Sequence, residues 1–206
     1  MMSKSKAIFD TTDGRRLRSR DSKLKIVAAM LELVREGRIA PTAEEVAQRA
    51  NVGLRTVFRR FKDMESLYAE MAVAISDQLA PIIDVALGDN NWPQNFIQLV
   101  QRRLKVYEII RPYRVAEEVL KFQSNILQKH HLDIVRAERV KLKSVLPKSL
   151  TKDLIMLEAL EAVLSFDMWN QLRSDQNLSA EEGGDVVNRI LTRLLPELAT
   201  GTTNKN

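Results

Sequence analysis

The stretch TAEEVAQRANVGLRTVFRRF, residues 42–61, contains a helix start, a break and a second short helical pattern. Thr42 followed by Glu45 matches a capping box, in which each side chain bonds the backbone N–H of the other residue. The residues NVG, 51–53, then interrupt the pattern, because asparagine and glycine favour turns. The stretch therefore predicts a helix of about eight residues, a three-residue turn and a second helix near residues 54–61, the helix-turn-helix arrangement.

The second helix of this stretch separates apolar from basic residues. The apolar residues recur at the i, i+3, i+4, i+7 spacing of a packing face: Leu54, Val57, Phe58 and Phe61. The opposite side carries polar residues: Arg55, Thr56, Arg59 and Arg60. An arginine side chain can bond guanine or phosphate, and threonine can contact a thymine methyl group. A merely solvated helix face would show the same pattern, so both interpretations stay open here.

The positive charge of the chain is concentrated in its first third. Residues 1–70 carry 15 Lys and Arg against 10 Asp and Glu, whereas residues 71–206 carry 17 against 17. Such asymmetry points to an anionic partner for the basic part, although a basic tail that only aids solubility would give the same count. Combined with the turn motif, the charge favours an arginine face that contacts phosphate.

Helical periodicity runs through nearly the whole chain without strand-like alternation, so we expect an all-α fold. The first helix is expected at residues 22–36, and Asp63 can cap a longer helix toward Leu79. The later helices are expected near 94–110, 113–145 (interrupted), 150–174 and 180–199. We expect four parts: a flexible basic N-terminal arm (1–20), a helix-turn-helix DNA-binding domain (21–66), a helical ligand-binding and dimerisation domain (67–200) and a disordered tail (201–206).

Composition argues against several classes of protein. The chain has no cysteine, which excludes disulfides and thiolate chemistry and suits the cytoplasm. It has no apolar run of about 18 residues and no signal-peptide pattern, so we expect a cytoplasmic protein without membrane association. It lacks a phosphate-binding glycine motif, and the adjacent His130 and His131 point about 100° apart on a helix. We therefore expect no enzyme, no cofactor and no metal site.

The order of a long helix followed by PTAEEVAQRANVGLRTVFRRFKDMESLYAE (residues 41–70) resembles the DNA-binding domain of TetR-type (TetR/AcrR) transcriptional regulators. The segment SFDMWNQLRSDQNLSAEE, residues 165–182, is similar to the junction of the last two helices in many members. The resemblance implies a homodimer, paired through these two helices, that binds a near-palindromic double-stranded DNA operator and is released by a small-molecule ligand. We expect a repressor; the alternative is a helical protein-interaction module without sequence-specific DNA binding.

The resemblance also assigns residues to DNA. It makes Thr42 and Thr56 phosphate contacts, and it turns Arg55 and Arg60 toward bases or backbone. Phe58 occupies a position that is usually tyrosine, and it lacks the hydroxyl that would bond phosphate. Likewise, Met64 replaces a common lysine and Gly53 replaces a capping serine. We therefore expect DNA affinity to depend more on other basic residues: Arg59, Lys62 and the arm residues Arg15, Arg16 and Arg18.

In the larger domain we expect the ligand to contact aromatic and methionine side chains, although such residues also form ordinary cores. The candidates are Phe96, Tyr107, Tyr113, Phe122, Phe166, Met168 and Trp169. Tyr107 and Trp169 stand out because each offers a polar group. The segment LIMLEALEAVLSFDMW, residues 154–169, is apolar around most of its circumference, which suits either a dimer interface or a helix buried in a monomer. Gly183 and Gly184 could permit close helix approach or mark a frayed first turn.

Overall fold

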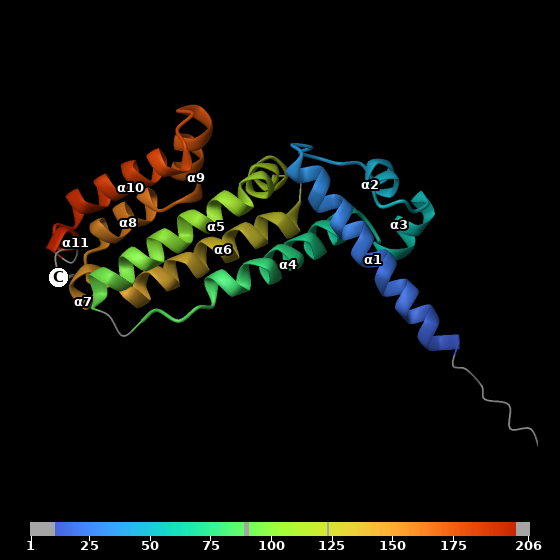
Figure 1. The fold of residues 1–206 in the computed structure, drawn as a ribbon, viewed down its shortest axis with the longest axis horizontal. Helices are drawn as coiled ribbons and strands as arrows, with labels where there is room; N and C mark the ends of the chain where they lie inside the picture. Colours follow the sequence, from blue (N-terminus) through green and yellow to red (C-terminus); the bar gives the residue numbers. More distant parts are fainter. Residues whose placement is uncertain (1–10, 89–90, 123, 201–206) are drawn as a thin grey trace, which may run out of the picture. The chain divides into compact units, whose positions relative to one another are not determined.

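A computed structural model describes residues 11–88, 91–122 and 124–200, and the regular elements among them are all helical (Figure 1). The chain divides into two compact units, Met1–Ala74 and Ile75–Asn206, called here the N-terminal and C-terminal units. The division falls inside a helix, later than the boundary at 66 expected from the sequence. The helices are α1 (Thr11–Arg35), α2 (Ala43–Arg49), α3 (Leu54–Arg60), α4 (Met64–Ile83), α5 (Trp92–Leu120), α6 (Asn125–Val145), α7 (Lys148–Lys152), α8 (Leu154–Val163), α9 (Phe166–Asn170), the π-helix η1 (Gln171–Asp175), α10 (Ala180–Leu194) and α11 (Glu197–Thr200).

The N-terminal unit is built on α1, which packs against both α2 and α3. Its core consists of side chains that are almost fully buried: Ile26, Met30 and Val34 from α1, Val46 from α2 and Val57 from α3. Lys23 on α1 makes an ion pair with Glu70 on α4 at 2.6 Å and lies 5.9 Å from the centre of the Phe61 ring. Lys23 thus connects α1 both to α4 and to the residue that ends α3.

The first helix begins earlier than the sequence analysis predicted. We expected a flexible arm over residues 1–20 and a helix from residue 22, but α1 already starts at Thr11. Arginine and leucine are good helix formers, so this polar segment continues the helix although it lacks the apolar periodicity on which the prediction relied. The predicted start of the first helix at residue 22 is therefore wrong, while residues 1–10 and the predicted tail at 201–206 lie outside the described residues.

The local signals in residues 42–61 are confirmed. The backbone N–H of Glu45 donates to Thr42 Oγ1 at 3.2 Å, and that of Thr42 donates to Glu45 Oε2 at 2.8 Å, which completes the capping box. Asn51 adopts a left-handed φ of 52° in the turn. Gly53 then caps α3 without a side-chain hydrogen bond, and Phe61 ends the helix in an extended conformation. Likewise, Asp63 Oδ1 accepts the N–H of Ser66 at 2.8 Å at the start of α4.

In the C-terminal unit the helix breaks differ from those expected. Pro112 lies inside α5, and the break comes instead after Leu120, with Ser124 capping α6. Buried side chains on both sides of the proline hold α5 together, among them Tyr107 and Tyr113. The single helix expected at 150–174 is divided into four elements. At two of the divisions a side chain caps the helix that begins there, as Asp and Ser side chains commonly do. Asp153 caps α8 and Ser165 caps α9.

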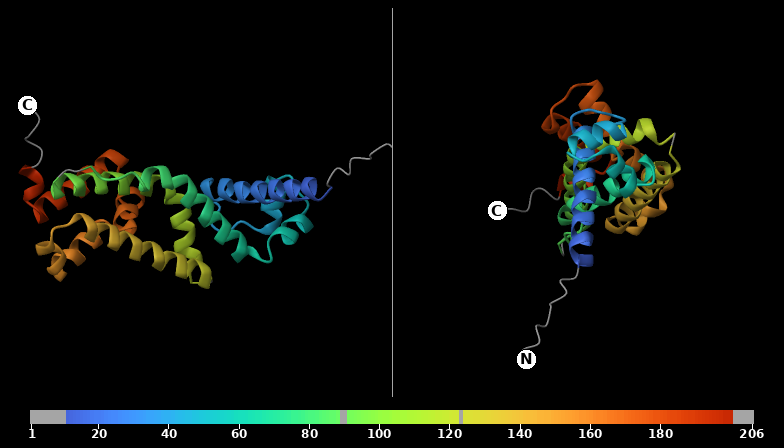
Figure 2. Two further views of the ribbon diagram at one scale, coloured as in Figure 1. Left: turned by 90° about the horizontal axis from the view of Figure 1, so that it is seen from below. Right: turned by 90° about the vertical axis from the view of Figure 1, so that its right-hand side faces the viewer.

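The long helix α5 is the central element of the C-terminal unit. It runs antiparallel to α6 and also contacts α9 and α11, while α8 packs against α10 (Figures 1 and 2). The largest fully buried side chains include Phe96 and Tyr107 from α5, Leu157 and Leu160 from α8, Trp169 from α9 and Leu191 from α10. A second predicted capping box, Ser179 with Glu182, is present at the start of α10. Five of the aromatic candidates of the sequence analysis lie in this packed interior, and Phe122 does not.

Two glycines of the N-terminal unit should respond oppositely to substitution. At Gly53, with φ −70°, an added Cβ meets no atom within 4 Å, so Gly53→Ser adds a capping hydroxyl and restricts the unfolded chain. We expect it to raise the free energy of unfolding by about 0.5–1 kcal/mol. Gly37 has a left-handed φ of 92°, which alanine adopts only with strain. Gly37→Ala should therefore lower the free energy of unfolding by about 1–2 kcal/mol. Urea denaturation followed by circular dichroism measures both; a destabilised Gly53→Ser variant would contradict the local geometry.

Candidate functional site

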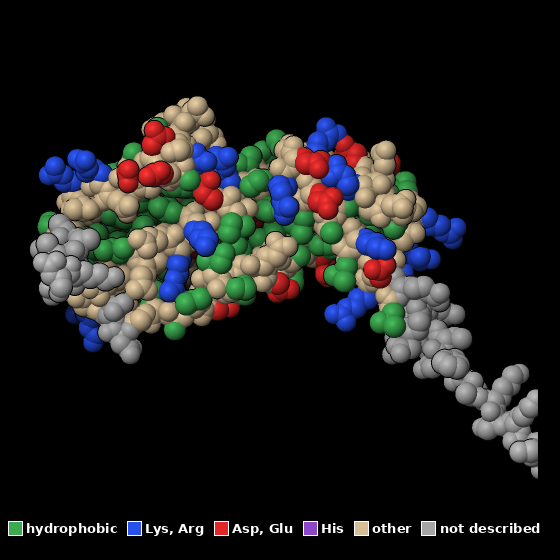
Figure 3. Space-filling model, in the orientation of Figure 1, with side chains coloured by type: hydrophobic (Ala, Val, Ile, Leu, Met, Phe, Trp, Pro, Cys, Tyr) green, Lys and Arg blue, Asp and Glu red, His purple; other side chains and the backbone are tan. Residues whose placement is uncertain are grey.

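The outward side of α3 carries positive charge without acidic partners. Arg55 and Arg59 are exposed and lie one helical turn apart, and the exposed Lys62 follows the helix. Among the described residues, none of these three cations forms an ion pair. Figure 3 shows Lys and Arg side chains projecting where α3 lies. The uncompensated charge leaves this side of α3 able to bind an anion.

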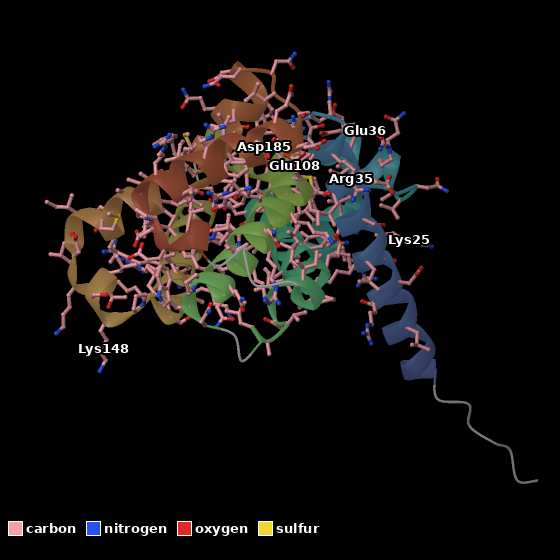
Figure 4. All side chains as sticks on the ribbon, turned by 60° about the vertical axis from the view of Figure 1, so that its left-hand side comes forward. Lys25, Arg35, Glu36, Glu108, Lys148 and Asp185 are labelled. Atoms are coloured by element: carbon pink, nitrogen blue, oxygen red, sulfur yellow. The ribbon has the colours of Figure 1, made fainter. Side chains whose placement is uncertain are left out.

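Other cations of the N-terminal unit are neutralised by neighbouring carboxylates. Arg49 at the end of α2 donates to Glu36 (labelled in Figure 4), which follows the last residue of α1, at 2.8 and 2.6 Å. This bond lowers the pKa of Glu36. Arg38 pairs with Glu45, whose pKa is lowered first by the backbone N–H of Thr42 and then by Arg38. The ion pairs join α1 to α2 and set these cations apart from those on α3.

The apolar face of α3 is narrower than the sequence suggested. Val57 and Phe61 are buried at 1% and 3% exposure, but Leu54 is 37% and Phe58 50% exposed. On a helix, Phe58 lies between the directions of Val57 and Arg55, nearer to the arginine side. The assignment of Phe58 to the packing stripe was therefore wrong, and its ring joins Arg55 and Arg59 on the outward side.

Arg60 occupies a different environment from Arg55 and Arg59. Its guanidinium donates a hydrogen bond to Ser19 Oγ on α1, and its Nε is buried without a hydrogen-bond partner among the described residues. Thr56, one turn earlier, is half-buried. The sequence analysis placed all four polar residues of α3 on one outward face, but the structure directs Arg60 toward α1.

The remaining residues predicted to contact DNA lie outside α3. Thr42 is exposed, and its hydroxyl oxygen accepts the capping N–H of Glu45, which leaves the hydroxyl hydrogen free to be donated. The backbone at Arg15, Arg16 and Arg18 belongs to α1, but their side chains lie outside the described part of the structure.

Most of the candidate ligand-binding residues pack as core. Phe96, Tyr107, Tyr113, Phe166 and Trp169 are buried, and Met168 is half-buried. The rings of Tyr107 and Phe166 meet edge to face with 5.5 Å between their centroids. Phe122 differs, since its side chain is 84% exposed beside Lys121 and is not enclosed in the C-terminal unit. The buried candidates are therefore part of the core, and two of them, Tyr107 and Phe166, contact each other.

Charged residues within this interior were missed by the sequence analysis. Arg103 donates to the backbone oxygens of Glu138 at 2.9 Å and Leu164 at 3.5 Å. The hydroxyl of Tyr107 lies 2.9 Å from both Glu138 Oε1 and the same Leu164 oxygen. These bonds join α5, α6 and the break between α8 and α9. The spacing of Arg103 in the sequence could have indicated that it is buried, because it lies one helical turn before Tyr107, at a core position of α5.

Burial is the largest influence on the pKa values of Glu138 and Tyr107. It raises the pKa of the Glu138 carboxyl above its ordinary value, although Arg103 and the Tyr107 hydroxyl oppose the shift. Burial likewise raises the pKa of Tyr107. Both groups therefore favour their neutral forms more than they would in water.

A second polar group fixes the π-helix to α5. Trp169 Nε1 and Arg173 Nε donate to Oε1 of Glu108 (labelled in Figure 4) at 2.8 and 2.9 Å. The bond from Arg173 lowers the pKa of Glu108. A Cβ added at Gly183 would lie 3.2 Å from the Trp169 ring, while one at Gly184 would meet no atom within 4 Å. Gly183 thus permits a close approach to a helix of the same chain, whereas the predicted approach of these glycines at a dimer interface stays a prediction. The indole N–H of Trp169 is already bonded.

Neither a metal cluster nor a membrane-spanning helix is seen in the described ranges. No group of three or more His, Cys, Asp or Glu side chains there is arranged to hold a metal ion. None of the described helices is long and apolar enough to cross a membrane.

Comparison of the chain with protein-family models, with curated proteins and with solved structures finds no match.

Two substitutions test the buried polar group. Tyr107→Phe removes the hydroxyl that serves Glu138 and Leu164, and should lower the free energy of unfolding by about 1–2 kcal/mol. Glu138→Gln keeps an acceptor for Tyr107 but removes the charge. Because the native pKa of Glu138 is raised, the native state binds more protons than the unfolded chain above about pH 4.5, so ionisation costs stability at neutral pH.

We therefore expect Glu138→Gln to be more stable than the wild type at pH 7, with the advantage lost as the pH falls toward 4.5. Urea denaturation at both pH values measures this difference. A variant that is destabilised at pH 7 and unchanged at low pH would show that the carboxylate charge is favourable in the native state.

Proposed function

We propose that this chain is a DNA-binding transcriptional regulator, and specifically a repressor that binds a near-palindromic operator as a homodimer and dissociates when a small molecule binds. The observation that carries the proposal is the outward side of α3, where Arg55, Arg59 and Lys62 have no ion pairs among the described residues. The resemblance of residues 41–70 to TetR-type regulators supports the same function.

In the proposed complex α3 is the second helix of a helix-turn-helix and enters the major groove. Arg55 and Arg59 are directed at guanine edges or phosphates, which arginine can bond through two N–H groups at once. Phe58, half exposed beside them, is placed to contact a thymine methyl group. Thr42, Thr56 and Lys62 add phosphate contacts, which orient the protein without reading sequence.

Arg60 has a supporting role in this proposal. Its hydrogen bond to Ser19 ties α3 to α1 next to the buried Val57 and Phe61. A base-reading helix must be held firmly, because small displacements remove bidentate contacts. We therefore assign Arg60 to positioning α3, and base contacts to Arg55 and Arg59.

The proposed dimer interface uses α8 and α10. Ile155, Ala159 and Ala162 follow one another at i, i+4, i+7 on the side of α8 away from the buried Leu157 and Leu160. Ile155 is 86% exposed, and a large aliphatic side chain in water favours association. A two-fold axis between such faces would present two α3 helices to half-sites about one helical turn of DNA apart, or more.

The proposed dimer has two states, one that fits the operator and one that does not. A ligand releases the protein from DNA only if it binds the second state more tightly than the first. The two units share α4, since the division at Ala74 lies within that helix. A change in the C-terminal unit that moves α4 would therefore reach the N-terminal unit through a continuous helix. The ligand would have to rearrange the aromatic and polar interior around α5.

Arginine substitutions on α3 test the proposal. Arg55→Ala and Arg59→Ala should each weaken binding to a duplex that the wild type retains from a random pool, by about 1–3 kcal/mol or roughly 5- to 150-fold. Where the lost contact is to phosphate, the slope of log affinity against log salt should fall by about 0.9. Fluorescence anisotropy at several salt concentrations measures both quantities.

Arg136→Ala is the matched control, because Arg136 is an exposed arginine on α6 and its loss changes the net charge equally. It should leave affinity and salt slope nearly unchanged. Equal effects of all three substitutions would indicate general charge attraction. No effect of either α3 substitution would favour the alternative, a helical interaction module without sequence-specific DNA binding.

A further inference from the structure

A cluster of ionisable side chains joins the end of α5 to the start of α6, and nothing in the proposed function uses it. We call it the α5–α6 polar cluster: Arg114, Glu117, Glu118 and Lys121 from α5, with His130 and His131 from α6. Arg114 and Glu117 are buried, at 6% and 7% exposure. A cluster this deep in the protein depends on which of its members are charged.

The hydrogen bond between Arg114 and His131 fixes the protonation of the imidazole. Arg114 Nη1 lies 3.1 Å from His131 Nδ1, and a guanidinium can only donate. His131 Nδ1 must therefore accept with its lone pair, so the ring is neutral in this arrangement. The same Nη1 also donates to Glu117, and one guanidinium nitrogen has two hydrogens for the two acceptors.

An acceptor for a second arrangement is already in place. Glu118 Oε1 lies 3.4 Å from His131 Nδ1, and it is a buried oxygen with no hydrogen-bond partner among the described residues. Arg114 Nη2 is 3.9 Å away, beyond hydrogen-bond distance, while Lys121 donates to the other oxygen of Glu118. Buried carboxylate oxygens are normally hydrogen-bonded, so an unbonded one next to a titratable ring needs an explanation.

We propose that His131 is a proton-operated switch between Arg114 and Glu118. When His131 takes a proton from solvent at Nδ1, that nitrogen stops accepting from Arg114 and donates instead to Glu118 Oε1. Arg114 loses one acceptor, keeps Glu117, and faces a new positive charge. Acid thus exchanges one hydrogen bond between α5 and α6 for another, and moves the guanidinium.

The charges around His131 set the pH of the exchange. Burial lowers its pKa below the ordinary value of 6.5, Arg114 and Lys121 lower it further, and Glu118 and Glu117 oppose them. His131 therefore takes its proton at a lower pH than an imidazole in water. Since the native pKa is lowered, the native state binds fewer protons than the unfolded chain, and stability falls as the pH drops below about 6.5.

The neighbouring His130 differs from His131 in its hydrogen bond. Its Nδ1 lies 2.7 Å from Glu117 Oε1, so a proton on that nitrogen makes the hydrogen bond instead of breaking it.

A movement of Arg114 would be felt by the aromatic residues of the core. Its guanidinium carbon lies 5.1 Å from the centre of the Phe166 ring on α9, and Phe166 packs on Tyr107. The switch thus connects solvent pH to the aromatic interior, and the inference does not depend on DNA binding.

Nitrogen-15 NMR of the two imidazoles in the full-length protein tests the proposal directly. The chain has only two histidines, and His130→Gln assigns their signals. We expect the Nδ1 of His131 to show an unprotonated nitrogen at pH 7 and to titrate with a midpoint below 6.5. Glu118→Gln, which removes the accepting charge, should move this midpoint to lower pH.

Asp133→Asn removes one negative charge from an exposed position on α6 and is the matched control; it should leave the midpoint of His131 nearly unchanged. A proton on Nδ1 of His131 at pH 7, a midpoint at or above 6.5, or equal shifts in the two carboxylate variants would overturn the proposal. The wild-type titration decides the first two points even if Glu118→Gln folds poorly.

Discussion

A seven-residue helix is too short to be stable alone in water, so α3 exists only because the rest of its unit holds it. Val57 and Phe61 are buried on one side of the helix, and α3 packs against α1 and α2. The opposite side, with Arg55 and Arg59, is thereby fixed in direction, although these arginines make no ion pair within the described part of the chain. This constraint explains why unpaired arginines can be presented outward on so small an element, and the proposed DNA contacts depend on it.

The C-terminal unit uses a different means to fix its helices. Arg103, Tyr107 and Glu138 place polar groups within an otherwise apolar core, where an unbonded group would be costly. Arg103 and Tyr107 on α5 bond both the Leu164 oxygen, between α8 and α9, and Glu138 on α6, and so join three elements. Arg114 and Glu117 do the same at the α5–α6 connection. Such bonds restrict the packing to one arrangement, but they also make it sensitive to anything that changes a charge, whether a ligand or a proton.

Local signals in the sequence were sufficient for much of the N-terminal unit. The capping box at Thr42, the turn after Ala50 and the short helix that follows were predictable, because each depends on residues close together in the chain. The start of α1 was not predictable from apolar periodicity, since its first turns carry almost no apolar side chains. The outward position of Phe58 and the inward position of Arg60 depend on how α3 is rotated against α1, and spacing leaves that rotation open by tens of degrees.

The same distinction holds for the C-terminal unit. A break was expected between residues 110 and 113, but α5 continues through Pro112, with buried side chains on both sides of it. Conversely, Asp153 and Ser165 carry clear capping chemistry that the continuous apolar pattern of residues 154–169 concealed. The aromatic residues could be recognised as interior, but periodicity cannot show whether an interior residue packs against other side chains or lines a ligand pocket. The charged core positions had the spacing of core residues and were overlooked because of their charge.

The measurement that tests the central claim most directly is an unbiased selection of bound duplexes from fragmented genomic DNA, using the purified full-length protein at near-physiological salt. A sequence-specific dimeric regulator predicts enrichment of an inverted repeat whose half-sites lie about one helical turn apart or more. Binding without any enriched sequence, or no binding at all, would contradict the account.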